Sequence, residues 1–235
     1  MADPPYLDPP RSMPTYPVRA PLVRWLREEA ARAHEDLGSY RVLDVGCGMK
    51  PYQPVFSRYA ASYVGVDPVE NPRAELLGSV EDLPVDDGSF DVVLCNQVLE
   101  HCVDPALAVR ELGRVTAPGG RVLASTHGVM PYHPSPTDYW RWTHAGLAKL
   151  FTDNGSWASI RVTPGSGTTA CLGMLVSINL DLFFRRVHAG FAARPLVSTI
   201  NGVAEAIDAR APRLREPAQG GTLFANFHVL AEVPR

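Results

Sequence analysis

Short apolar runs alternate with amphipathic stretches through the middle of the chain. The runs have the length and the β-branched or aromatic content of strands. They cover residues 41–46, 63–67, 90–96 and 121–126, with a weaker run at 75–78. Because the main runs are continuous rather than alternating, we expect strands that are buried on both faces, as in a parallel sheet with helices on either side.

The stretches between the runs predict helices, and capping residues indicate where these begin. An apolar stripe starts after Pro21 and ends at Gly38. Asp104 and Pro105 favour the start of a second helix, which we expect to end at the turn 118–120. Thr143 is expected to cap a third, reaching about Asn154. Strands that alternate with helices predict an α/β fold, a Rossmann-like doubly wound sheet in a single domain.

The two ends of the chain differ from this alternation. Residues 1–21 carry seven prolines and predict an irregular arm. We therefore divide the chain into an arm with the N-terminal helix, 1–37, and a main domain, 38–235. The main domain is expected to hold a short strand at 160–163 and a helical insertion at about 168–209, with helices over 168–186 and 195–209. A long final strand over 222–233 is expected to run antiparallel to the rest.

Composition narrows the class of protein. A net charge of −3 argues against nucleic acid as a partner. Four cysteines without a C-x-x-C pair, and a start without the pattern of a signal peptide, indicate a reduced, cytoplasmic protein. The apolar run 170–180 is short for a membrane span. The helix 168–186 ends in two arginines, so it either rests on a membrane surface, covers the sheet or forms a dimer contact; the chain is expected to be a monomer or homodimer.

Candidate ligand-binding residues follow the first two strands. The first ends in Asp44-Val45-Gly46-Cys47-Gly48, where glycines allow a tight turn and close approach of a ligand. The second ends in Asp67, a carboxylate suited to the two hydroxyls of a ribose. A dinucleotide fingerprint would need glycine at position 51, which is proline, so a nucleoside without pyrophosphate fits better. An ordinary strand–turn–helix junction remains the alternative.

Four segments in series resemble a known family. They are RVLDVGCGMKPY, YVGVD, SVEDLPVDDGSFDVVLCNQVLEH and RVTAPGGRVLAS. Together they cover roughly residues 38–127 and are similar to the class I S-adenosylmethionine-dependent methyltransferases, most closely the type 11 small-molecule group.

The resemblance implies S-adenosyl-L-methionine as cofactor and assigns residues to it. The glycine loop would lie under its methionine part, Asp67 would bind its ribose, the segment before Leu83 would contact its adenine, and the end of the fourth strand would face its methionine end. The implied residues are Asp44, Gly46, Cys47, Gly48, Asp67, Val80, Glu81, Asn96 and Gln97. Ser79 stands where family members often have Asp, so Glu81 is expected to substitute for it. Asp44 has a structural alternative, that of binding loop amides.

The segment 127–147 lies where the family builds its acceptor site. Its candidates for substrate binding are Tyr132, Asp138, Tyr139 and Arg141, and the alternative is a rigid lid with Asp138 and Arg141 as an internal pair. His101 and His133 are candidate catalytic bases, or else structural histidines. The histidines here match no metal-ligand spacing, so no metal is expected. Tyr16 and Arg19 are candidates to close over the carboxylate of the cofactor, and a disordered terminus is the alternative.

The sequence therefore predicts a methyltransferase that acts on oxygen or nitrogen of a small, sugar- or natural-product-like acceptor. Two alternatives remain: a binding subunit with this fold and no catalysis, and an NAD-dependent oxidoreductase.

Overall fold

A seven-stranded, mostly parallel sheet forms the centre of the molecule. The computed structural model describes residues 6–217 and 220–235. The strands are β1 (Tyr40–Val45), β2 (Ala60–Asp67), β3 (Leu76–Leu77), β4 (Phe90–Asn96), β5 (Thr116–His127), β6 (Ser159–Pro164) and β7 (Asn226–Glu232). They lie in the order β3-β2-β1-β4-β5-β7-β6, and β7 runs antiparallel to both neighbours. The predicted fold class, including the antiparallel final strand, is confirmed.

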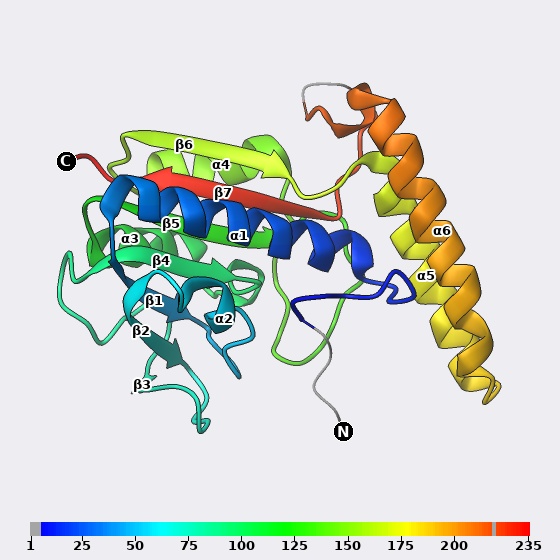
Figure 1. Cartoon of the computed structure of the whole chain (residues 1–235), viewed down its shortest axis with the longest axis horizontal. Coiled ribbons are helices and arrows are strands. Elements are labelled where there is room, and N and C mark those ends of the chain that lie inside the picture. The colour runs from blue at the N-terminus through cyan, green and yellow to red at the C-terminus, as the bar shows by residue number, and fades with distance from the viewer. Residues whose placement is uncertain (1–5, 218–219) are drawn as a thin grey trace.

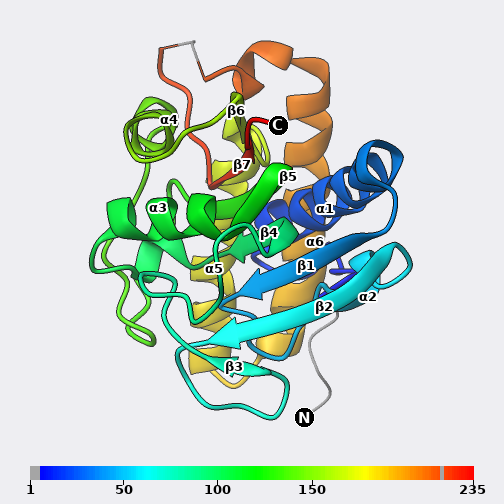
Figure 2. The ribbon, with the colours of Figure 1, turned by 90° about the vertical axis from the view of Figure 1, so that its left-hand side faces the viewer.

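Helices cover both faces of this sheet and one of its ends. On one face lie α1 (Tyr16–Leu37) and the short α2 (Gln53–Phe56), and on the other α3 (Pro105–Val115) and α4 (His144–Asp153) (Figures 1 and 2). The chain also forms two 3-10 turns, η1 (Leu99–His101) and η2 (Pro212–Arg215). The helices α5 (Thr168–Arg186) and α6 (Gly190–Arg210) pack against each other as a hairpin, which stands at the end to which β4 and β5 point (Figure 1).

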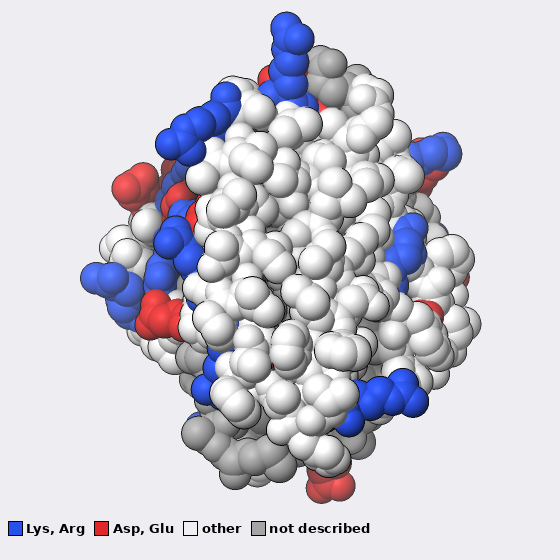
Figure 3. Space-filling model, turned by 90° about the vertical axis from the view of Figure 1, so that its right-hand side faces the viewer, with Lys and Arg blue, Asp and Glu red and all other residues white. Residues whose placement is uncertain are grey.

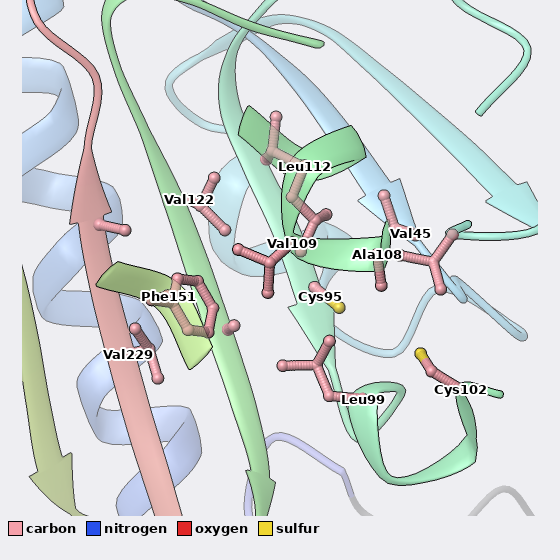
Figure 4. Close-up of a cluster of buried hydrophobic side chains, with 14 of the residues drawn as sticks. Val45, Cys95, Leu99, Cys102, Ala108, Val109, Leu112, Val122, Phe151 and Val229 are labelled. Carbon is pink, nitrogen blue, oxygen red and sulfur yellow. The ribbon is translucent and has the colours of Figure 1, made fainter. Parts of the chain in front are cut away.

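The core explains why these runs form a buried sheet. On the α3 side, Val109 and Leu112 pack with Val122 of β5 and Phe151 of α4 (Figure 4). On the α1 side, a second apolar cluster joins that helix to the middle strands. The predicted cap of α3 is present, since the Asp104 carboxylate accepts 3.0 Å hydrogen bonds from two backbone amides of the first turn. Burial on both faces accounts for the continuous apolar runs.

The ends of several elements differ from the prediction. Helix α1 begins at Tyr16 rather than after Pro21, because Pro17 lies in its first turn, where a missing N–H costs no hydrogen bond. Strand β5 begins at Thr116, so residues 118–120 continue into a strand rather than form a separate turn. There Thr116 pairs with Phe90 of β4.

The C-terminal third shows two further differences. Helix α6 begins at Gly190 instead of 195, with Pro195 inside it, and β7 begins at Asn226 instead of 222. Pro195 lies in the second turn, where its fixed φ is compatible with a helix although one hydrogen bond is lost. The division into an arm with its helix and a main domain stays a prediction, and the part of the arm at 1–5 lies outside the described residues.

Candidate functional site

A cleft of about 1080 Å³ opens at the carboxyl ends of β1 and β4. The predicted site residues that line it are Asp44, Gly46, Cys47, Gly48, Asn96, Gln97, His101 and His133. The structure thus brings the glycine loop, the end of β4 and both candidate bases together around one space. Residues from the N-terminal segment and the first turn of α1 complete the lining, among them Tyr6, Val18 and Arg19.

The glycine loop has a backbone that side chains would disrupt. Gly46 has a φ of 67°, and a Cβ placed on it would lie 2.4 Å from Cγ2 of Val98. Its N–H donates to the carbonyl of Val66 at 2.8 Å, which ties the loop to β2. Gly48 has a φ of 48°. Both residues therefore need glycine, and the loop presents bare backbone to the cleft.

The loop does not continue as it does in a dinucleotide-binding fold. The helix that follows, α2, has four residues and begins two residues after Pro51. The pyrophosphate of NAD is held at the N-terminus of a longer helix that packs on the sheet. This geometry disfavours the oxidoreductase alternative.

Asp44 is buried at the bottom of the cleft beside a tyrosine that the sequence did not single out. Its carboxylate accepts a 2.6 Å hydrogen bond from the Tyr63 hydroxyl of β2. Burial raises the pKa of Asp44 to about 7. Burial also raises the pKa of the Cys47 thiol to about 12, so this thiol stays protonated at neutral pH and is a poor nucleophile.

Asp67 lies at the predicted position at the end of β2. One of its carboxylate oxygens accepts from the Gly48 amide at 2.8 Å and the other from the Val69 amide at 3.0 Å. Each carboxylate oxygen has a second lone pair, so the group retains the capacity to accept from a ribose.

Val80 and Glu81 are less suited to the predicted adenine contact. Val80 is buried in the core, and Glu81 accepts a 2.7 Å hydrogen bond from the Asp104 amide at the start of α3. Among the described residues, the cleft lining includes neither of these two nor Asp67. Their assignment to the cofactor stays a prediction.

A buried ion pair supports the glycine loop and was missed in the sequence. Lys50 has a buried side chain, and its ammonium contacts both carboxylate oxygens of Glu75. Glu75 also accepts from the Gly65 amide at 2.6 Å. The pair therefore fixes the loop to β2. A lysine two residues after Gly48 was the available signal, but its partner is 25 residues away and could not be inferred.

A polar network closes the end of β4. Gln97, with a φ of 59°, donates to Ser125 Oγ and to Asn226 Oδ1, each at 3.0 Å. Asn96 Oδ1 accepts from the same serine at 3.0 Å. The amide nitrogen of Asn96 and the amide oxygen of Gln97 are buried without a hydrogen-bond partner. Since buried polar groups normally have partners, these two atoms are suited to hold a polar ligand.

Three histidines and a glutamate meet in the cleft. The ring of His133 lies 5.0 Å from that of His101 and 5.9 Å from that of His127, between centroids. His127 Nε2 is 3.2 Å from Oε1 of Glu100, whose other oxygen accepts from Thr126 Oγ1 at 2.8 Å. The carboxylate of Glu100 is fully buried. Within the described part of the chain, no three His, Cys, Asp or Glu side chains are arranged to hold a metal ion.

Burial sets the protonation of this cluster. It raises the pKa of Glu100 to about 7 and lowers that of His127 to about 3. The imidazole is therefore neutral at pH 7, while the carboxyl group is divided between its two forms. Burial also lowers the pKa of His101. Glu100 was missed because it follows an apolar strand and nothing in its local sequence marks it as buried.

The segment before α4 is held rigid by the internal pair considered above. Asp138 is buried and pairs with Arg141 through both oxygens. Arg141 also donates to the carbonyls of Met130 and Pro131 at 2.9 and 3.1 Å. Tyr132 and Tyr139 are exposed. The charged pair thus shapes the segment, and among the described residues the cleft lining includes none of the four predicted acceptor residues, so their role in substrate binding stays a prediction.

Arg19 and Tyr16 have different surroundings. The guanidinium of Arg19 lies in the cleft lining, 4.6 Å from the ring centroid of Tyr6. The Tyr16 hydroxyl points to Glu205 of α6, at 3.5 Å. Only the arginine is placed to meet a ligand in the cleft.

The family model for the type 11 methyltransferase domain matches residues 43–124, the part that carries the glycine loop and the end of β4. Residues 43–124 form a methyltransferase domain of the type 11 group, which confirms the resemblance of the four sequence segments.

Curated relatives match about half of this chain. An uncharacterized methyltransferase of Mycobacterium tuberculosis is 37% identical over 48% of this chain and 46% of its own. A ubiquinone biosynthesis O-methyltransferase of Pseudomonas aeruginosa is 33% identical over 48% of this chain and 53% of its own. The chain thus spans about half the length of the curated relatives it matches.

Solved methyltransferases share the fold over most of the chain. A putative sarcosine dimethylglycine methyltransferase of Galdieria sulphuraria has a TM-score of 0.56 at 13% identity, covering 90% of this chain and 84% of its own. A 1,6-didemethyltoxoflavin-N1-methyltransferase of Burkholderia thailandensis has a TM-score of 0.53 at 16% identity, and the match covers 89% of this chain and 78% of that protein's chain.

Proposed function

We propose that the protein transfers a methyl group from S-adenosyl-L-methionine to an oxygen or nitrogen atom of a small-molecule acceptor. The observation that carries this proposal is a single cleft that joins the glycine loop to the cluster of Glu100 and three histidines. A binding subunit without catalysis would have no use for proton-accepting groups in that position.

The residues present fit the cofactor. Bare backbone at Gly46 and Gly48 permits close approach, and Asp67 has oxygen lone pairs for the ribose. The amide nitrogen of Asn96 and the amide oxygen of Gln97, which lack partners, would bind the polar methionine end. When bound, S-adenosyl-L-methionine supplies an electrophilic methyl group on a positively charged sulfur.

The reaction is a direct displacement in which no bond to the protein forms. An acceptor lone pair forms the new bond to the methyl carbon, and the carbon–sulfur bond breaks with its electron pair passing to sulfur. The protein aligns the acceptor with the methyl carbon and keeps water out of the cleft. With a hydroxyl acceptor, the proton passes to a base, for which the candidates are Glu100 with His127, His101 and His133.

The cluster favours oxygen as the accepting atom. A neutral amine needs no base, whereas a hydroxyl gains from one that takes its proton. The relative from P. aeruginosa is named an O-methyltransferase, which agrees with this preference. The rings of Tyr132 and Tyr139 are exposed outside the cleft lining, where they would contact a part of a flat or sugar-like acceptor that extends beyond the cleft.

Titration calorimetry with S-adenosylmethionine and S-adenosylhomocysteine tests the first half of the proposal. We expect both to bind, and Asp67→Asn to bind tenfold to a hundredfold more weakly, because a charged hydrogen bond is worth about 1.5–3 kcal/mol. Asp86→Asn, an exposed carboxylate away from the cleft, is the matched control and should bind like the wild type. Failure of the wild type to bind either compound would refute the proposal.

Mass spectrometry of the products tests the second half of the proposal, the transfer of the methyl group to an acceptor. The protein is incubated with S-adenosylmethionine and a panel of phenols, sugars and amines, and each is examined for the gain of one methyl group. Binding of the cofactor without transfer to any oxygen or nitrogen acceptor would favour the binding subunit.

A further inference from the structure

The hairpin of α5 and α6 borders the cleft. On the inner side of α5, Cys171 and Met174 are buried against Val18 and Met130. These last two also line the cleft. The hairpin therefore stands at the same end of the sheet as the candidate active site (Figure 1).

The outward side of the hairpin is broadly apolar. Seen from the side on which the hairpin lies in Figure 1, the molecule presents a wide surface without Lys, Arg, Asp or Glu, and the charged groups lie at its margin (Figure 3). The exposed apolar side chains of the hairpin are Leu172, Val176, Leu182, Phe183, Val187, Phe191, Leu196, Val203 and Ile207. Phe191, at the tip, is 77% exposed. A continuous apolar surface of this kind marks a contact with a partner or a membrane.

Two exposed polar side chains of the hairpin, Asn179 and Thr199, have hydrogen bonds that do not depend on water. The Asn179 amide donates to the carbonyl of Leu175 at 2.8 Å, and the Thr199 hydroxyl donates to that of Pro195 at 3.0 Å. Each bond joins two residues of the same helix, the first in α5 and the second in α6. These side chains can therefore enter an apolar medium at a lower cost than free polar groups.

Basic residues lie at both ends of the apolar surface. Arg186 and Arg194 flank the tip, and Arg210, Arg213 and Arg215 lie at the opposite end. Within the described part of the chain, none of these five pairs with a carboxylate. The three acids within α5 and α6 are engaged elsewhere: Asp181 pairs with Arg185, Glu205 pairs with Arg11, and Asp208 accepts from two backbone amides of α5.

This charge pattern distinguishes two occupants of the surface. A second copy of the chain would bring arginines against arginines whether the hairpins lay parallel or antiparallel, and such like-charge contacts are unfavourable. A layer of anionic lipid headgroups would attract both ends at once. Helix α5 has the length and composition of a membrane span, with 28% of its most apolar window buried. Its packing against α6 and the body favours a helix that lies along the surface.

We propose that the apolar face of the α5–α6 hairpin docks onto an anionic membrane surface. Its Phe, Leu, Val and Ile side chains enter the boundary between headgroups and acyl chains, and the arginines at its ends bind the headgroups. Docking places the cleft beside the bilayer.

Co-sedimentation with vesicles tests this proposal. We expect the full chain to bind vesicles of phosphatidylcholine with phosphatidylglycerol, to bind pure phosphatidylcholine vesicles at least tenfold more weakly, and to be released by high salt. The pair Val176→Asp/Val203→Asp puts two charges into the face and should abolish binding. Val69→Asp/Val103→Asp makes the same change at two other exposed valines, outside the hairpin, and should reduce binding much less.

Arginine variants at the tip test the charge of the surface separately from its apolar side chains. Arg186→Gln/Arg194→Gln should weaken binding to the anionic vesicles about tenfold, while Arg58→Gln/Arg73→Gln, with the same loss of charge, should have a smaller effect. Circular dichroism verifies that each variant folds.

Three results would overturn the proposal. The wild type could remain in solution with every vesicle, or the two aspartate pairs could bind equally well. Light scattering could also show a dimer that Val176→Asp/Val203→Asp dissociates, in which case a second copy covers the face.

Discussion

Glu100 has the properties of a general base, because burial raises its pKa into the neutral range. Its carboxyl group lies in the cleft, 3.2 Å from His127 Nε2, and its pKa of about 7 makes proton uptake feasible near neutral pH. The neutral imidazole beside it, with its pKa lowered to about 3, does not compete for the proton. The pair of Glu100 and His127 is therefore a stronger candidate for the catalytic base than His101 or His133, which the sequence predicted.

Replacing this carboxylate should remove a pH dependence. Only the ionised form accepts a proton, so kcat with a hydroxyl acceptor should rise as pH increases through about 7. Glu100→Gln should lose that rise and lower kcat by about 10²–10⁴-fold. The measurement is kcat against pH, with the exposed Glu70→Gln as control. An unchanged profile in Glu100→Gln would move the role to a histidine, which His101→Ala and His133→Ala then test singly.

The positions of some candidate site residues were predictable because they depend on the local chain. The glycines at 46 and 48 and the acid at the end of β2 are fixed by the geometry of one turn and one strand end. Glu100 and the pair Lys50–Glu75 were not predictable, because their roles depend on burial and on partners distant in sequence.

Elements were predicted well where apolar periodicity defines them and less well at their ends. The predicted bounds of α5, 168–186, agree with the structure, since a long apolar helix carries its own signal. Strand β5 begins earlier than expected because its first residues pair with β4, a contact that no local pattern reveals.

The attachment of the hairpin depends on one buried carboxylate. Asp208 of α6 accepts from the amides of Thr169 and Ala170 at the N-terminus of α5, at 3.0 and 2.9 Å. Asp208→Ala leaves these amides unpaired and should lower the free energy of unfolding by about 1–3 kcal/mol, measured by urea titration.

A neighbouring residue on the same helix serves as the control. Glu205 is more exposed and pairs with Arg11 on the surface, so Glu205→Ala should change the free energy of unfolding by less than about 1 kcal/mol. Equal losses in the two variants would show that Asp208 has no special role in joining α5 to α6.

Several buried titratable groups make the stability of the whole molecule depend on pH, and they do so in opposite directions. Asp44 and Glu100 have raised pKa values, so the stability that they contribute is lost as pH rises toward about 7. His127 and His228 have pKa values lowered to about 3, so the folded state binds fewer protons than the unfolded one between pH 3 and 6.5. Their contribution is lost as pH falls through that range. A single variant compared with the wild type separates these effects.

His228 is the residue best suited to that comparison. It lies buried on β7, and its ring stacks on Trp25 of α1 at 4.7 Å between centroids, so it joins the helical layer to the sheet. His228→Phe keeps a ring for the stack but cannot take up a proton. From pH 6.5 downward, the wild type should therefore lose stability relative to the variant, by about 1 kcal/mol per pH unit. The measurement is the difference in free energy of unfolding between the two proteins from pH 7 to 4.5, with His188→Asn, at an exposed position, as control. A difference that stays constant with pH would mean that His228 can be protonated without unfolding, and that the contact between α1 and β7 opens to water.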